Sequence, residues 1–199
     1  RFEDGKFDKA VMVEEGTTNL ATAGHRNIES LTHIFIQSGS PTISISEDWS
    51  YIGTKSLKVV GSDTSNRIRI FDAFSRSDTS SRLTYSAYIY NPNSTPITVY
   101  GANYINGNVT IPPYSVGRLE NTTPAGVPWT VIYEHIYEIS GKTFYLDAVQ
   151  IEEKPYATSF IDGTRAAETL TIPTAGVLNL QEGTIALWFK PYPAFWNGS

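Results

Sequence analysis

The chain has no cysteine, a single methionine and almost no helical periodicity in its 199 residues. Without cysteine there can be no disulfides and no thiolate metal sites. No run of about 18 apolar residues occurs, so the sequence predicts no membrane-spanning helix. Lys and Arg (15) are fewer than Asp and Glu (20), which gives a net charge of −5. Nucleic-acid-binding domains usually carry a basic face, so this balance argues against a nucleic-acid partner.

Short β-branched and aromatic runs recur instead, separated by clusters of Gly, Pro, Asn and Ser at intervals of about 8 to 12 residues. This pattern predicts an all-β, antiparallel β-sandwich. Asn106-Gly107 between two alternating runs predicts a two-residue hairpin turn. The predicted strands are Lys9–Glu14, Thr32–Gln37, Thr42–Ser46, Ser56–Val60, Arg67–Phe71, Arg82–Tyr90, Ile97–Ile105, Asn108–Ile111, Trp129–Ile139, Thr143–Glu152, Glu168–Ile172 and Thr184–Lys190.

The strand predicted at Thr143–Glu152 has an acidic residue, Asp147, at a position where the alternation predicts an apolar one. Side chains in a strand repeat with period two, so Tyr145, Asp147, Val149 and Ile151 are expected on one face. A carboxylate removed from water needs a partner cation, hydrogen-bond donors or a metal ion. Asp147 is therefore a candidate site residue.

The two ends of the chain differ from its middle. Gly5–Val13 (GKFDKAVMV) and Leu178–Lys190 (LNLQEGTIALWFK) resemble two parts of a laminin-G or concanavalin-like sandwich. We therefore expect residues 1–15 and 163–199 to be pieces of one truncated lectin-like domain, with a second domain at 16–162 between them. The alternative is that both ends supply edge strands to a single sandwich. Because the chain begins with Arg1, we also expect it to be part of a longer polypeptide.

The central segment carries short motifs in a familiar order: Thr18-Asn-Leu-Ala, Asn27-Ile-Glu-Ser, Gly53-Thr-Lys-Ser-Leu-Lys-Val, Phe144-Tyr-Leu-Asp-Ala-Val-Gln-Ile-Glu and the run from Pro155 to Arg165. In this order they resemble the jelly-roll carbohydrate-binding modules of the family 4, 9 and 22 type, as found in phage and prophage tail or minor structural proteins. The resemblance implies a non-catalytic domain that binds glycans.

The same resemblance implies a structural calcium ion. Its ligands would be Glu29, backbone oxygens of the turn ending at Lys55, and Asp147. The sequence departs from the family pattern at Asn27, where an Asp is usual, and at Ala148, where a second Asp is usual. The alternative is that Asp147 pairs with Lys55 or Arg67.

Strand parity gives candidate glycan-binding aromatics. Alternation in the strands predicted at Arg82–Tyr90 and Ile97–Ile105 leaves four tyrosines facing away from the core. If these strands are neighbours, the tyrosines form a platform for pyranose rings, with two tryptophans beside it. The alternative is that the tyrosines pack beneath loops. The candidate residues are Tyr88, Tyr90, Tyr100, Tyr104, Trp129 and Trp49.

Nothing in the sequence predicts catalysis. The histidines at 25, 33 and 135 follow no metal-ligand spacing, and no nucleophile elbow or phosphate-binding loop occurs. We therefore predict a non-enzymatic module of a virion (phage tail) or cell-surface protein that docks on host or cell-wall polysaccharide, alone or within an oligomeric tail assembly. The alternatives are a structural spacer of a virion protein and an accessory module of a secreted glycoside hydrolase.

Overall fold

The computed structural model describes residues 2–3, 10–11, 13–62, 66–73, 80–102, 107–126, 131–138 and 141–169. The chain divides into two compact units. One consists of Arg1–Gly16 and Ala166–Ser199, and the other of Thr17–Arg165. The strand predicted at Thr184–Lys190 lies outside the described residues. Within the part that is described, no helix is long and apolar enough to cross a membrane.

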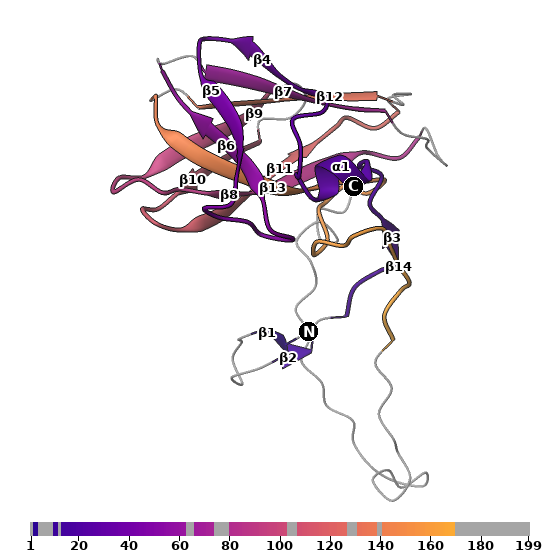
Figure 1. Cartoon of the computed structure of the whole chain (residues 1–199). Coiled ribbons are helices and arrows are strands. Elements are labelled where there is room, and N and C mark those ends of the chain that lie inside the picture. The colour runs from indigo at the N-terminus through magenta and orange to yellow at the C-terminus, as the bar shows by residue number, and fades with distance from the viewer. Residues whose placement is uncertain are drawn as a thin grey trace, which may run out of the picture. The chain divides into compact units, whose positions relative to one another are not determined.

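The larger unit is a β-sandwich of two antiparallel five-stranded sheets (Figure 1). We call them the β7 sheet, in the order β10-β9-β12-β7-β4, and the β13 sheet, in the order β11-β8-β13-β6-β5. The prediction of an all-β sandwich is confirmed. The elements are β1 (Phe2–Glu3), β2 (Ala10–Val11), β3 (Thr17–Thr18), α1 (Ala23–Arg26), β4 (Ile34–Ser38), β5 (Thr42–Ser46), β6 (Ser56–Val60), β7 (Asn66–Ala73), β8 (Thr84–Tyr90), β9 (Ile97–Ala102), β10 (Gly107–Ile111), β11 (Val116–Thr122), β12 (Val131–Glu138), β13 (Thr143–Glu152) and β14 (Thr164–Arg165).

The core lies between the two sheets and follows the expected alternation. In β8, Tyr85, Ala87 and Ile89 are buried, whereas Tyr88 and Tyr90 lie on the outward face of the β13 sheet. Ile and Leu side chains from both sheets fill the same cluster. Burying a side chain of this size contributes about 1.5 to 3 kcal/mol, so this alternation is the main source of stability.

Two features of the strand order differ from the prediction. β11 was not predicted, because its inward positions hold Gly117, Leu119 and Asn121 and so lack apolar alternation. A Cβ atom at Gly117 would meet Ile111 Cγ1 at 2.7 Å, so only glycine lets β11 approach β10 this closely.

The predicted hairpin of β9 and β10 exists, but Gly107 pairs with Gly101 within the paired strands. The prediction of an Asn-Gly turn that includes Gly107 is therefore wrong.

The last long strand, β13, contains a β-bulge. Its register with β8 shifts just after Asp147, and Ala148 has a φ of 53°, which is uncommon for a residue with a side chain. Tyr145 and Asp147 consequently face outward, whereas Val149 and Ile151 join the core. The prediction that these four residues share one face is wrong, because the period-two rule fails across the extra residue.

The chain enters and leaves the larger unit at one place. β3 pairs with β14, so Thr18 lies opposite Thr164 (Figure 1). Beside this pair the fully buried Glu152 carboxylate accepts hydrogen bonds from the Thr17 and Thr158 hydroxyls at 2.8 and 2.6 Å. Adjacent termini are the geometry that a domain needs when it is inserted into another chain segment.

Candidate functional site

The predicted aromatic platform is divided between two sheets. β8 belongs to the β13 sheet and β9 to the β7 sheet, so these strands are not neighbours and their four tyrosines do not form one platform. Sequence alternation gives the direction of a side chain but does not indicate which sheet its strand joins. Tyr88 and Tyr90 thus lie on the β13 sheet with Trp49 beside them, Tyr100 lies on the β7 sheet, and Tyr104 and Trp129 are outside the described residues.

The outward face of the β13 sheet, which we call the β13 face, is covered by its own chain. Tyr51 stacks on Tyr88 with ring centroids 3.6 Å apart, and Trp49 stacks on Tyr90 at 5.6 Å. Both covering rings come from the loop at 47–55 between β5 and β6. The tyrosines of β8 therefore pack beneath a loop, as in the alternative considered from the sequence. Tyr51 and Tyr145 were not among the candidate residues, although Tyr51 stands two residues after Trp49.

Asp147 anchors this loop to the sheet. Its carboxylate is fully buried and accepts hydrogen bonds from the backbone N–H groups of Tyr51 at 2.8 Å, Ile52 at 2.9 Å and Ile28 at 3.3 Å. Burial raises the pKa of Asp147, and these backbone donors act in the opposite direction. Asp147 therefore has hydrogen-bond donors as partners, rather than the Lys55 or Arg67 side chain.

A second acid holds the same loop from its exposed side. Asp48 Oδ2 accepts hydrogen bonds from Lys58 Nζ at 2.9 Å and from the Tyr145 hydroxyl at 3.0 Å. The hydrogen bond from Lys58, together with those from Ser46 and Tyr145, lowers the pKa of Asp48 from 3.8 to about 2. Two carboxylates thus fasten one loop over the β13 face.

The outward face of the β7 sheet, which we call the β7 face, has a different composition. In these strands the residues that alternate with the buried Ile68, Ile70 and Val99 point outward and form the β7 face. These are Phe35 on β4, Arg67 and Arg69 on β7, Thr98 and Tyr100 on β9, and Asn108 and Thr110 on β10.

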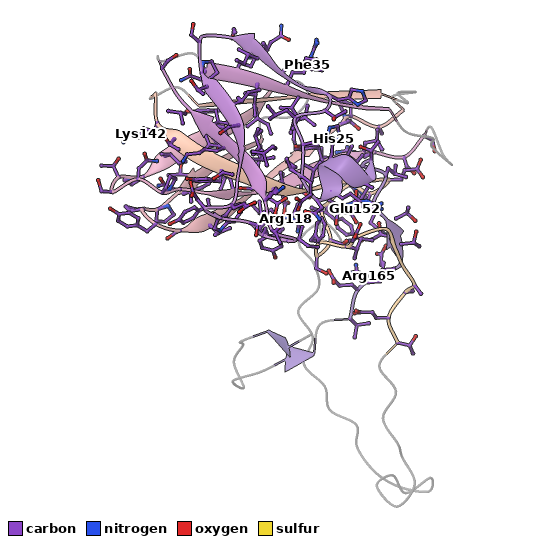
Figure 2. All side chains as sticks on the ribbon, viewed as in Figure 1. His25, Phe35, Arg118, Lys142, Glu152 and Arg165 are labelled. Carbon is purple, nitrogen blue, oxygen red and sulfur yellow. The ribbon has the colours of Figure 1, made fainter. Side chains whose placement is uncertain are left out.

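The β7 face contains a contact between a guanidinium group and an aromatic ring, and a contact between two hydroxyl groups. The Arg69 guanidinium lies over the Phe35 ring, 5.4 Å from its centroid. The hydroxyl groups of Thr98 and Thr110 are 2.9 Å apart. Phe35 is 44% exposed. Figure 2 shows Phe35 and Arg118, which belongs to the β13 face, on opposite sides of the sandwich. The β7 face therefore offers an aromatic ring, hydroxyl groups and guanidinium groups on one sheet, a combination that suits a polyhydroxylated ligand.

No family model matches the chain, and no curated protein matches it. Among solved structures it is similar to the xylan-binding domain from carbohydrate-binding module family 22, at 16% identity and a TM-score of 0.52, over 67% of this chain and 94% of that one. The fold is a jelly-roll β-sandwich. The predicted jelly-roll β-sandwich is thereby confirmed.

Two further structures share this jelly roll. The C-terminal family 22 module of Clostridium thermocellum Xyn10B is 16% identical with a TM-score of 0.52, over 69% of this chain and 94% of that one. The tandem family 22 modules of Paenibacillus barcinonensis Xyn10C are 12% identical with a TM-score of 0.54, over 75% of this chain and 50% of that one. At these identities the likeness concerns the fold, and the ligand of this chain has to be argued from its own side chains.

The predicted calcium ligands lie around the turn at Gly53. Glu29 accepts a hydrogen bond from the Thr54 N–H group at 3.4 Å, and its carboxylate is 3.9 Å from Lys55 Nζ. Asn27 Oδ1 is buried without a hydrogen-bond partner, and it is the atom that a Cβ at Gly53 would meet first, at 2.4 Å. The Asn27 oxygen and the Glu29 carboxylate both lie at this turn, and oxygen ligands of these kinds suit a hard cation.

Two observations limit that fit. Both oxygens of Asp147 already accept backbone N–H groups, and the Lys55 ammonium group would have to move away from Glu29. Among the described residues, no three His, Asp or Glu side chains converge in a metal-binding group. A calcium ion here would therefore be held by Glu29, the Asn27 amide oxygen and carbonyl oxygens of the turn, with Asp147 organising the loop beside them.

Replacing Asp147 with alanine should destabilise the fold strongly. The change leaves three N–H groups without their acceptor, at a cost of about 1 to 3 kcal/mol for each group that stays buried. We expect the free energy of unfolding in urea to fall by about 3 kcal/mol or more. Asp162→Ala is the control, because this exposed acid pairs with Arg26 at the surface, where an ion pair is worth less than about 1 kcal/mol. Equal effects of the two changes would contradict the role of Asp147.

The Asp48 carboxyl group should titrate with a midpoint near pH 2 in the folded protein. Because its folded pKa lies below the ordinary 3.8, the stability that its contacts add is present above about pH 4 and is lost as pH falls through 2. Carbon-detected NMR of the carboxyl groups measures this midpoint. In Lys58→Met the midpoint should rise toward 3.8, and an unchanged midpoint would show that Lys58 is not the cause.

Proposed function

We propose that the β7 face binds a polysaccharide without catalysing a reaction on it. The observation that carries the proposal is the difference between the two faces. On the β13 face the strand residues Tyr88 and Tyr90 stack against Tyr51 and Trp49 of the 47–55 loop, of which Tyr51 is itself 45% exposed. On the β7 face the strand residue Phe35 is 44% exposed and lies beside guanidinium and hydroxyl groups. Aromatic and Arg side chains are the groups that most often carry binding energy at recognition surfaces.

The fold supports this proposal. One of the similar structures is described as a xylan-binding domain, and another as a carbohydrate-binding module with conserved amino acids in its cleft that have a role in ligand binding. On the present chain, Tyr100 occupies the outward face of β9, and its backbone pairs with Tyr137 of β12 and Asn108 of β10. Tyr100 thus lies on the strand next to the edge strand β10, with a strand on each side, where a polysaccharide lying across the strands would pass over it.

We also propose the kind of protein to which this domain belongs. The order of the sequence motifs supports a phage tail or other surface protein. The pairing of β3 with β14 supports a domain inserted between segments of a larger structure, which is how a binding module can be displayed on a scaffold. In such an assembly many copies would act together, and weak single sites would gain avidity.

Binding should be lost when Tyr100 is replaced by alanine. We expect the affinity for a polysaccharide from a panel of xylan and bacterial cell-wall polymers to fall by about tenfold or more, as for a typical central aromatic contact. Affinity electrophoresis measures the change. Tyr88→Ala is the matched control, because it removes the same side chain from the β13 face.

The same pair of variants separates the alternatives. Binding that survives Tyr100→Ala and disappears in Tyr88→Ala would place the ligand on the β13 face, with the predicted Tyr88, Tyr90 and Trp49. No binding to any polymer in the panel would favour a structural spacer. Melting temperatures of both variants must be compared with that of the wild type, because Tyr88 stacks on Tyr51.

We also propose a calcium ion at Asn27 and Glu29. A ligand that binds only the folded state stabilises it by about 2.7 kcal/mol at a hundred times its Kd, which is a rise in Tm of roughly 5 to 10 °C for a domain of this size. Adding EDTA should reverse the rise, and Asn27→Ala should abolish it. Melting curves that coincide with and without calcium would contradict the proposal.

A further inference from the structure

We propose that the free edge of β4 is an interface between two copies of this chain, which pair antiparallel through Ile36. This inference goes beyond the binding of a polysaccharide and does not depend on it. It comes from the side of the sandwich at which the core is partly uncovered.

The two sheets have four edge strands, and two of these close one side of the sandwich. β10 is the last strand of the β7 sheet, and β11 is the last strand of the β13 sheet. A Cβ atom at Gly107 of β10 would meet the main-chain oxygen of Glu120 of β11 at 2.2 Å. A Cβ atom at Gly117 of β11 would meet Ile111 Cγ1 of β10 at 2.7 Å. The edges of β10 and β11 therefore cover each other.

The other two edge strands, β4 and β5, leave part of the core uncovered. Ile36 pairs with the fully buried Ile68 and shares the inward side of β4 with the buried Ile34. Although it faces inward, Ile36 is 46% exposed. Ile43 and Ile45 of β5 also pack against the core and are only partly buried. Apolar side chains that stay in contact with water in this way mark a surface for another chain.

The main chain of β4 has a donor and an acceptor on its free side. Ile34 donates its N–H group to the carbonyl oxygen of Leu31 at 3.1 Å, so this N–H group does not point toward β7. The main-chain groups of successive residues in a strand point to alternate sides, so the N–H and C=O groups of Ile36 also point away from β7. Among the described strands, β4 pairs with β7 alone. An edge of this kind is a template for a further strand.

A second copy of β4 fits this edge because the pairing is self-complementary. When two β4 strands run antiparallel about a two-fold axis at Ile36, each Ile36 N–H group donates to the C=O group of the other Ile36. The two Ile36 side chains then lie opposite each other on the inward side and cover one another. The five residues of β4, IFIQS, carry no charge that would repel a second copy.

The same axis would direct both β7 faces to one side of the dimer. It is perpendicular to the sheet, so the two β7 sheets form one continuous sheet and their outward faces point the same way. Two such faces could hold one polysaccharide together and gain avidity. Because the paired strand has only five residues, the contact is small, and we expect a weak dimer with a Kd of about 0.1 to 1 mM.

Sedimentation equilibrium of the full chain between about 10 μM and about 1 mM tests this pairing. We expect the wild type to dimerise reversibly. Ile36→Lys and Ile36→Glu should each weaken association by about tenfold or more, because like charges then face each other across the axis. An equimolar mixture of the two variants should associate again, because Lys then lies opposite Glu. A loss of folding would not be reversed by mixing.

Val116→Lys and Val116→Glu are the matched controls, because Val116 is also 46% exposed and lies on the edge strand β11. Both should dimerise as the wild type does. A wild type that stays monomeric at about 1 mM, or a mixture of the Ile36 variants that stays monomeric, would overturn the proposal. Association that depends on Val116, or on neither position, would also overturn it. None of these results bears on the binding of a polysaccharide at Tyr100, which is measured separately.

Discussion

The arrangement of the sandwich depends on one buried carboxylate. Asp147 stands at a bulge in the central strand of the β13 sheet and collects backbone N–H groups from two loops far away in sequence. A buried charge of this kind is tolerated only when donors surround it. The loop that Asp147 holds places Tyr51 on Tyr88 and Trp49 on Tyr90. The covered state of the β13 face therefore follows from this anchor.

The two faces of the molecule consequently differ in their contacts. On the β13 face, aromatic rings and paired charges satisfy one another, as the contacts of Asp48 with Lys58 and Tyr145 illustrate. On the β7 face, the guanidinium of Arg69 lies over the ring of Phe35, which is 44% exposed.

Much of the fold could be predicted from local patterns. β5, β6 and β13 begin and end where alternation and turn residues predicted, and the inward and outward sides of β8 were correct. β11 could not be predicted, because Gly117 replaces an apolar residue to let two strands approach. The bulge at Ala148 also escaped detection, since its left-handed backbone has no glycine to mark it.

The candidate site was harder to predict than the fold, because it depends on strand order. Tyr88 and Tyr100 have the same local signature, and only long-range pairing separates them onto different sheets. The direct measurement is an NMR titration of the isotope-labelled chain with oligosaccharides of the bound polymer. The account predicts that amide shifts change on β4, β7, β9 and β10 and stay constant on β6 and β8. Shifts confined to β6, β8 and the 47–55 loop would contradict it.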